Sequence, residues 1–159
     1  MSRKLVAYFS ATGTTAGLAQ RLADAAGADL FDIRPETPYK SADLDWQDAS
    51  SRSTREMNDA AARPAIAGKC GSMADYDVVF VGFPIWWYLA PRIINSFLES
   101  YDFSGKTVIS FASSGGSGMG ETLRHLAPSC PGARLVEGKV LRAGSSTEAL
   151  TAWVKSLGV

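Results

Sequence analysis

The residues with the clearest chemical potential form a short hydroxyl-rich turn near the N-terminus. The turn reads Ser10-Ala11-Thr12-Gly13-Thr14-Thr15, after an apolar strand and before a helix. Its hydroxyls, its glycine and the unpaired N–H groups of the helix start can hold a terminal phosphate through neutral hydrogen bonds. A loop that transfers a phosphoryl group would carry a Lys, and this turn has none. The pattern favours a bound cofactor phosphate, although a simple turn with a threonine N-cap explains the same residues.

A second loop, from Phe83 to Pro91, carries three consecutive aromatic side chains. Such a group is costly to leave in water and usually contacts a ligand or a partner. A flat heteroaromatic ring can stack on one tryptophan, while the other packs under the loop as part of the core. The candidate ligand contacts in this loop are Pro84, Ile85, Trp86, Trp87 and Tyr88.

A third loop is rich in glycine and serine and follows another apolar strand. Small residues allow close backbone approach, and exposed N–H and C=O groups can pair with the polar edge of a planar ring. A flexible linker would have the same composition, but the position after a strand favours binding. The candidate residues are Ser113, Ser114, Gly115, Gly116, Ser117 and Gly118. One ligand satisfies all three loops, a mononucleotide with a flat polar ring, and FMN fits best.

Alternating strand and helix patterns predict the elements that position these loops. We expect strands at 4–9, 29–33, 78–82, 107–112 and 134–141, and helices at 14–26, 91–101, 121–126 and 147–157, with Thr147 as the N-cap of the last. This alternation predicts an α/β fold, a doubly wound five-stranded parallel sheet in a single domain over residues 1–159. Ligands bind such sheets beyond the carboxyl ends of the strands, where the three loops would meet.

The polar segment 35–75 is harder to interpret. A helix near Ser51–Ala62 is expected, and the segment could either cover the ligand or mediate dimerisation.

The overall composition argues against two classes of binding partner. The 159 residues carry 16 basic and 16 acidic side chains, so no global charge favours nucleic acid or a membrane surface. Neither a signal peptide nor a membrane span is recognisable, which makes the cytoplasm the expected location.

The three loops together resemble those of the flavodoxin family, over essentially the whole chain. The resemblance rests on Tyr8 to Thr15, on Gly82-Phe83-Pro84-Ile85-Trp86-Trp87, and on Ser113 to Gly118. It is nearest to a short flavodoxin-like branch with a Pro-Ile-Trp-Trp second loop. It implies strand order 2-1-3-4-5 and FMN as cofactor, with the isoalloxazine between the second and third loops. The phosphate would then lie at Ser10, Thr12, Gly13, Thr14 and Thr15.

One residue departs from that family pattern. The branch commonly has glycine after the two tryptophans, where this chain has Tyr88. In flavodoxins a flexible peptide here can turn to accept a hydrogen bond from N5 of the reduced flavin. Because tyrosine adopts positive φ less readily than glycine, we expect weak stabilisation of the one-electron-reduced flavin. The pair Arg63-Pro64 also matches the branch, without an assigned role.

Two functions fit this cofactor. The first is electron transfer between redox partner proteins. The second is an FMN-dependent NAD(P)H oxidoreductase acting on quinones or nitroaromatics. Carriers of this fold are generally acidic, and the neutral charge of this chain leans toward the reductase, whereas the family resemblance leans toward the carrier. A non-redox module that retained the fold is a third class. The chain would be a monomer or a homodimer.

The remaining polar residues suggest no further chemistry. Electron transfer needs no protein acid or base, so we predict no catalytic residue and interpret His125, the single histidine, as a surface or packing residue. Cys70 and Cys130 are isolated, and no spacing predicts a metal site. Arg92 could contact a substrate or an NADPH phosphate, but a surface position on its helix is the expected one.

Overall fold

A computed structural model of the chain describes residues 3–114 and 118–159. Its main feature is a five-stranded sheet of order β2-β1-β5-β6-β7 in which all neighbours are parallel. Counting these strands along the chain gives the order 2-1-3-4-5, so the predicted fold class and strand order are confirmed. The strands of this sheet are β1 (Lys4–Tyr8), β2 (Asp29–Asp32), β5 (Val78–Pro84), β6 (Thr107–Ser113) and β7 (Arg134–Leu141).

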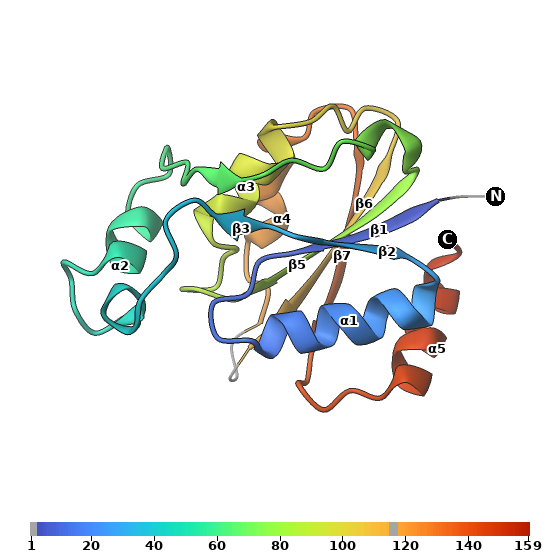
Figure 1. The fold of residues 1–159 in the computed structure, drawn as a ribbon, viewed down its shortest axis with the longest axis horizontal. Coiled ribbons are helices and arrows are strands. Elements are labelled where there is room, and N and C mark those ends of the chain that lie inside the picture. The colour runs from blue at the N-terminus through green and yellow to red at the C-terminus, as the bar shows by residue number, and fades with distance from the viewer. Residues whose placement is uncertain (1–2, 115–117) are drawn as a thin grey trace.

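Helices cover both faces of the sheet (Figure 1). On one face lie α1 and α5, and on the other lie α3 and α4. Their bounds are α1 (Thr14–Ala26), α3 (Arg92–Glu99), α4 (Thr122–Leu126) and α5 (Thr147–Leu157). The first and last of these agree with the predicted ranges.

Strand β5 shows why the sheet needs both helical layers. Its side chains alternate, with Val79, Val81 and Phe83 packed in the layer of α3, and Val78 and Phe80 in the layer of α1 and α5. All five side chains are buried. A continuous apolar run of this kind is typical of a central parallel strand covered on both faces.

Gly82 continues the same strand at a point of close approach. A Cβ at this position would lie 2.1 Å from the ring of Phe111 on the neighbouring strand β6. The absence of a side chain therefore lets the phenyl ring pack over the strand, and this holds the carboxyl ends of β5 and β6 together where the predicted site lies.

A projecting segment separates β2 from β5 in the chain, and we call residues 36–65 the arm. It contains the 3₁₀ helix η1 (Ser41–Leu44) and helix α2 (Arg52–Met57), and extends beyond the carboxyl ends of the strands (Figure 1). A small antiparallel pair, β3 (Arg34–Pro35) with β4 (Ile66–Ala67), closes its base. The chain is completed by two further 3₁₀ helices, η2 (Met73–Asp75) and η3 (Ala127–Ser129).

Two local predictions about helix ends are wrong. Helix α5 is capped by Ser146, whose Oγ accepts a hydrogen bond from the Ala149 N–H at 3.1 Å, so Thr147 is the first helical residue and not the cap. Helix α2 ends at Met57, five residues before the predicted boundary. None of the helices in the described part of the chain has the length and apolarity of a membrane span.

Candidate functional site

The turn after β1 is organised by the side chain of Ser10. Its Oγ accepts hydrogen bonds from the backbone N–H groups of Gly13, at 3.0 Å, and Ala16, at 3.2 Å. Gly13 adopts φ 95°, in the left-handed region that suits glycine, and is the N-cap of α1. The expected alternative of a threonine N-cap is therefore wrong. The turn leaves the first N–H groups of α1 without partners inside the helix, as every helix start does.

The threonines of this turn point in two directions. Thr12 and Thr14 are exposed, and both line a pocket of about 410 Å³ at the carboxyl ends of the strands. Thr15 is buried, and its Oγ1 lies 2.7 Å from the Oγ of Ser113 at the end of β6. The Thr15 and Ser113 side chains thus bond to each other and join the first predicted loop to the third.

The same pocket brings all three predicted loops together. The second loop contributes Pro84, Ile85 and Trp86, and the third contributes Ser113 and Ser114. The N–H of Ile85 donates to the carbonyl of Ser113 at 3.0 Å, which holds the two loops side by side. Gly118 is exposed, while the predictions at Gly115, Gly116 and Ser117 fall outside the described residues.

Three lining residues of this pocket are not among the predicted site residues, and one of them, Ala11, belongs to the first loop. Ala143 follows β7, and its carbonyl accepts a hydrogen bond from the Arg21 guanidinium on α1, which holds this loop beside the turn. Leu44 comes from η1 in the arm. Among the lining residues that the structure describes, none has a charged side chain, so an anion here would rely on hydroxyls and N–H groups.

The second loop forms a tight turn with an unusual backbone. Trp86 and Leu89 exchange hydrogen bonds, 2.9 Å and 3.0 Å between N and O, and the two residues between them both have positive φ, Trp87 50° and Tyr88 63°. Positive φ at both central positions is the pattern of a type I′ turn, which usually holds Asn or Gly. Tyr88 therefore adopts positive φ although this conformation costs tyrosine more than glycine, and the weak stabilisation of the one-electron-reduced flavin stays a prediction.

Gly120, and Thr122 on α4, which follow the third loop, lie against this turn. The hydroxyl of Thr122 on α4 donates to the carbonyl of Met119 and also lies 3.3 Å from the carbonyl oxygen of Tyr88. A Cβ at Gly120 would lie 2.6 Å from that same carbonyl oxygen, so only glycine permits the observed approach. The turn keeps its strained backbone because α4 packs directly against it.

Comparison with models of known protein families shows to which family this chain belongs. The flavodoxin family model matches residues 3–157. The chain belongs to the flavodoxin family. Comparison with curated proteins finds no match.

Solved structures support the same assignment. A crystal structure named "putative flavoprotein" from Bacteroides eggerthii is 50% identical, with TM-score 0.94, over 100% of this chain and 99% of that one. A second structure with the same description, from Bacteroides uniformis, is 50% identical with TM-score 0.91 over 97% and 98%. A flavoprotein from Lactobacillus acidophilus in complex with FMN is 19% identical, with TM-score 0.71 over 97% and 99%. This last likeness is one of fold.

In this flavodoxin-family chain, an aromatic cluster joins the arm to the sheet. The ring of Trp86 packs 5.8 Å from Phe9 and 5.5 Å from Tyr39, centroid to centroid, and Tyr39 belongs to the arm. The Tyr39 hydroxyl donates to Glu56, and the Arg52 guanidinium lies 3.8 Å from the centre of its ring. Burial, and then the bond to Glu56, raise the pKa of Tyr39 well above 10.

A second, adjacent pocket lies between the arm and the strained turn. It has a volume of about 390 Å³ and shares Leu44, Ile85 and Trp86 with the first pocket. Its other lining residues are Trp46, Ser53, Trp87 and Tyr88. The arm therefore covers the site from one side. Sequence reasoning left this possibility open, and Trp46, a large aromatic in a polar stretch, was the available signal.

Arg92 has a structural role that differs from the expected surface position. It is only 5% exposed, and its Nη2 donates to the carbonyl of Met57 at 3.0 Å, at the end of α2. Burial lowers the pKa of Arg92, and the nearby Arg63 adds to this effect. Arg92 thus ends α2 and fixes the arm to α3. It lines neither of the two adjoining pockets.

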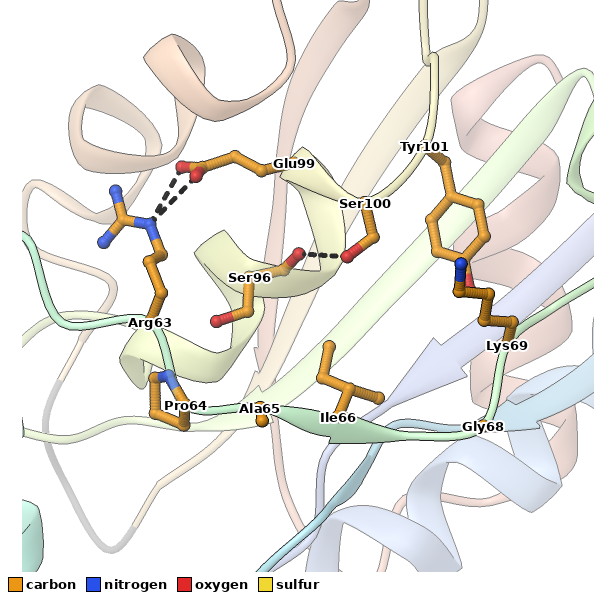
Figure 2. Close-up of a pocket in the computed structure, with 10 residues that line it drawn as sticks. All are labelled: Arg63, Pro64, Ala65, Ile66, Gly68, Lys69, Ser96, Glu99, Ser100 and Tyr101. Carbon is orange, nitrogen blue, oxygen red and sulfur yellow. Dashed lines mark hydrogen bonds and ion pairs between the residues drawn. The ribbon is translucent and has the colours of Figure 1, made fainter.

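Arg63 fixes the C-terminal end of the arm to α3. Its Nε donates to both carboxylate oxygens of Glu99, at 3.1 Å and 3.0 Å (Figure 2). Glu99 also accepts a bond from Ser129, and these bonds, Arg63 first, lower the pKa of Glu99. The surrounding cavity of about 280 Å³ contains none of the predicted site residues, so the Arg63-Pro64 pair anchors the arm.

His125 lies at the surface, one of the two positions expected for it from the sequence. Its carbonyl accepts a hydrogen bond from the Asn95 side chain. Cys130 is buried, which raises the pKa of its thiol, and Cys70 is half-buried. Within residues 3–114 and 118–159, no group of three or more His, Cys, Asp or Glu side chains is placed to hold a metal ion.

Proposed function

We propose that this protein binds FMN and transfers electrons between redox partner proteins. The observation that carries the proposal is the convergence of three loops, including the start of α1, on one uncharged pocket of about 410 Å³. Its donors suit a phosphate, because Thr12 and Thr14 present hydroxyls beside the N–H groups of a helix start, of which that of Ala16 already donates to Ser10. The FMN-bound relative of the same fold supports the choice of cofactor.

Each part of the pocket has a role in this proposal. Thr12, Thr14 and the first N–H groups of α1 hold the phosphate, while Pro84, Ile85 and Trp86 border the ring on one side. Ser113 and Ser114 border it on the other. Bound FMN supplies the redox chemistry, since it accepts and releases one or two electrons. The Pro-Ile-Trp-Trp sequence of the second loop further suggests the short flavodoxin-like branch.

A second candidate function is an FMN-dependent NAD(P)H oxidoreductase. The observation that favours it is the adjoining pocket of about 390 Å³, which a carrier that docks to another protein does not need. The exposed tryptophan and tyrosine side chains around that pocket suit a small aromatic acceptor such as a quinone or a nitroaromatic compound.

Titration of the purified protein with FMN tests the proposal, with riboflavin as the matched ligand without a phosphate. We expect one FMN per chain and markedly weaker riboflavin binding, because the hydroxyls and N–H groups of the first loop lose their anion. Equal affinity for the two ligands would contradict a phosphate site at α1. Anaerobic addition of NADH or NADPH then separates the functions. Rapid bleaching of the flavin supports the reductase, and reduction only by light or a partner reductase supports the carrier.

A further inference from the structure

The pocket between the arm and the strained turn has features of a ligand site in its own right. Two of its walls are aromatic side chains that remain accessible, Trp46 at 68% exposed and Tyr88 at 60%. Trp87, a further wall, is 43% exposed. Its volume of about 390 Å³ lies in the range of small-molecule sites, roughly 300–1,000 Å³.

Backbone strain concentrates at this pocket. Trp87 and Tyr88, both lining residues, are the two non-glycine residues with positive φ in the described chain. Left-handed backbone costs about 1–2 kcal/mol per residue, and such strain tends to persist where it serves a site. Here the strained turn presents two aromatic side chains to the pocket, opposite Trp46 on the arm.

The charge of the pocket limits what it can hold. None of the described side chains that line it is charged. Exposed Asp45 and Asp48 lie near Trp46 in the sequence, and Arg52, beside Ser53, is paired with Glu56, so these neighbours supply no net positive charge to attract an anion. A nicotinamide dinucleotide, which carries a pyrophosphate, therefore fits this pocket poorly, whereas an uncharged aromatic ring fits well.

A buried hydroxyl gives the pocket its polar contact. Ser53 on α2 lines the pocket and is only 2% exposed. Its Oγ meets Ser51 Oγ at 3.5 Å, and the latter already donates to Thr54 at 2.9 Å. Hydroxyl hydrogen bonds are normally about 2.7–2.8 Å long, so the Ser53 proton is available to a better acceptor. An oxygen on a bound ring, from a quinone carbonyl or a nitro group, supplies one.

We propose that this pocket binds a flat, uncharged aromatic molecule bearing a hydrogen-bond-accepting oxygen, beside the FMN site. Trp46, Trp87 and Tyr88 would enclose the ring, and Ser53 would donate to its oxygen. The position of this molecule beside FMN rests on the function proposed above, but the pocket itself and its ligand class do not. Shared walls at Leu44, Ile85 and Trp86 keep the two sites in contact.

A pair of matched probes tests the proposal, 4-nitrotoluene and p-xylene, which differ by a nitro group in place of a methyl group. Both are titrated into FMN-saturated oxidised protein and followed by the NMR resonances of the tryptophan indole N–H groups. We expect 4-nitrotoluene to shift the Trp46 and Trp87 signals. Ser53→Ala should weaken 4-nitrotoluene binding about threefold to tenfold, the value of one hydrogen bond, and leave p-xylene binding unchanged.

Trp46→Ala provides the second variant, since its exposed side chain makes misfolding of little concern. It should weaken both probes about tenfold while FMN affinity stays unchanged, because Trp46 lines only the second pocket. Leu30→Ala on β2, another exposed apolar side chain, is the control and should change nothing. Repeating the titrations without FMN separates the two proposals, because the Ser53→Ala effect on 4-nitrotoluene should persist there even if FMN does not bind.

Several results would overturn the proposal. If Ser53→Ala affects both probes equally, or neither, the hydroxyl does not select the ligand. Loss of FMN affinity in Trp46→Ala would make the pocket part of the flavin site. Concentration-dependent broadening of the Trp46 and Trp87 signals, without any response to the probes, would assign the surface to a second copy of the chain.

Discussion

The two halves of the candidate site reach their shapes by opposite means. The turn at the start of α1 takes its positive φ at Gly13, where the energetic cost is small. The side chain of Ser10 closes this turn by accepting hydrogen bonds from the N–H groups of Gly13 and Ala16. The turn after β5 takes positive φ at Trp87 and Tyr88, where the cost is high. The first half is encoded locally, and the second exists because the rest of the fold holds it.

The two halves of the site therefore depend on the surrounding fold to different degrees. A phosphate needs the same few donors in any protein that binds one, and a short local turn supplies them. The aromatic half has to present large side chains in a fixed orientation, which requires support from the arm and from α4. The first half would therefore tolerate changes in the surrounding fold, whereas the second would be sensitive to them.

The largest expected effect comes from breaking the phosphate half. Thr12→Val combined with Thr14→Val removes two hydroxyl donors, each worth about 1.5–3 kcal/mol in a bond to an anion. FMN affinity should fall on the order of a hundredfold or more, with riboflavin affinity little changed, as measured by fluorescence titration.

Thr15→Val is the matched control for that pair, because its hydroxyl bonds to Ser113 and not to the pocket. It should cost stability, about 1–2 kcal/mol for the partner left unsatisfied, with a much smaller loss of FMN affinity. An FMN affinity that survives the Thr12 and Thr14 changes would place the phosphate elsewhere.

The next effect separates the two tryptophans of the aromatic half. Trp86→Ala removes a ring packed against Phe9 and Tyr39 and should lower the free energy of unfolding by about 3 kcal/mol. Trp87→Ala, at an exposed position, should cost about 1 kcal/mol. Thermal unfolding of the two variants measures the difference, and Trp86→Phe should recover part of the loss. Equal losses would show that Trp86 does not support the arm.

The features that the sequence could predict are those that depend on local sequence, and the features that it could not predict depend on tertiary contacts. The range of α1 and the meeting of three loops at one edge could be predicted, because they depend on local periodicity and on a general rule for parallel sheets. The strand order followed from the family resemblance alone. The N-cap of α5 was misassigned by one residue, since Ser146 and Thr147 both suit the position and only the observed bond distinguishes them.

The arm could not be predicted because its contacts lie far away in the sequence. Helix α2 ends where the Arg92 guanidinium, 35 residues later, binds the carbonyl of Met57. The positive φ of Tyr88 could not be predicted for the same reason, since the contact with Gly120 and Thr122 appears only in the folded chain. Intrinsic preference disfavours this conformation, and tertiary contacts override it.

The smallest expected effect measures the backbone strain at Tyr88. Alanine is ordinarily more favourable than glycine by about 0.5–1 kcal/mol in regular structure. At Tyr88, with φ 63°, the order should reverse, because an alanine there still bears the left-handed penalty and a glycine does not. We expect Tyr88→Gly to be more stable than Tyr88→Ala by about 1 kcal/mol in chemical denaturation.

Comparing these two variants with each other cancels the loss of the tyrosine ring, which both share, and leaves the backbone. Trp46, an exposed aromatic residue of the second pocket without positive φ, is the control. There Trp46→Gly should not be more stable than Trp46→Ala. If alanine were favoured at position 88 as well, the turn would carry no strain there. The aromatic half would then be as locally encoded as the phosphate half, and the contrast between the two would disappear.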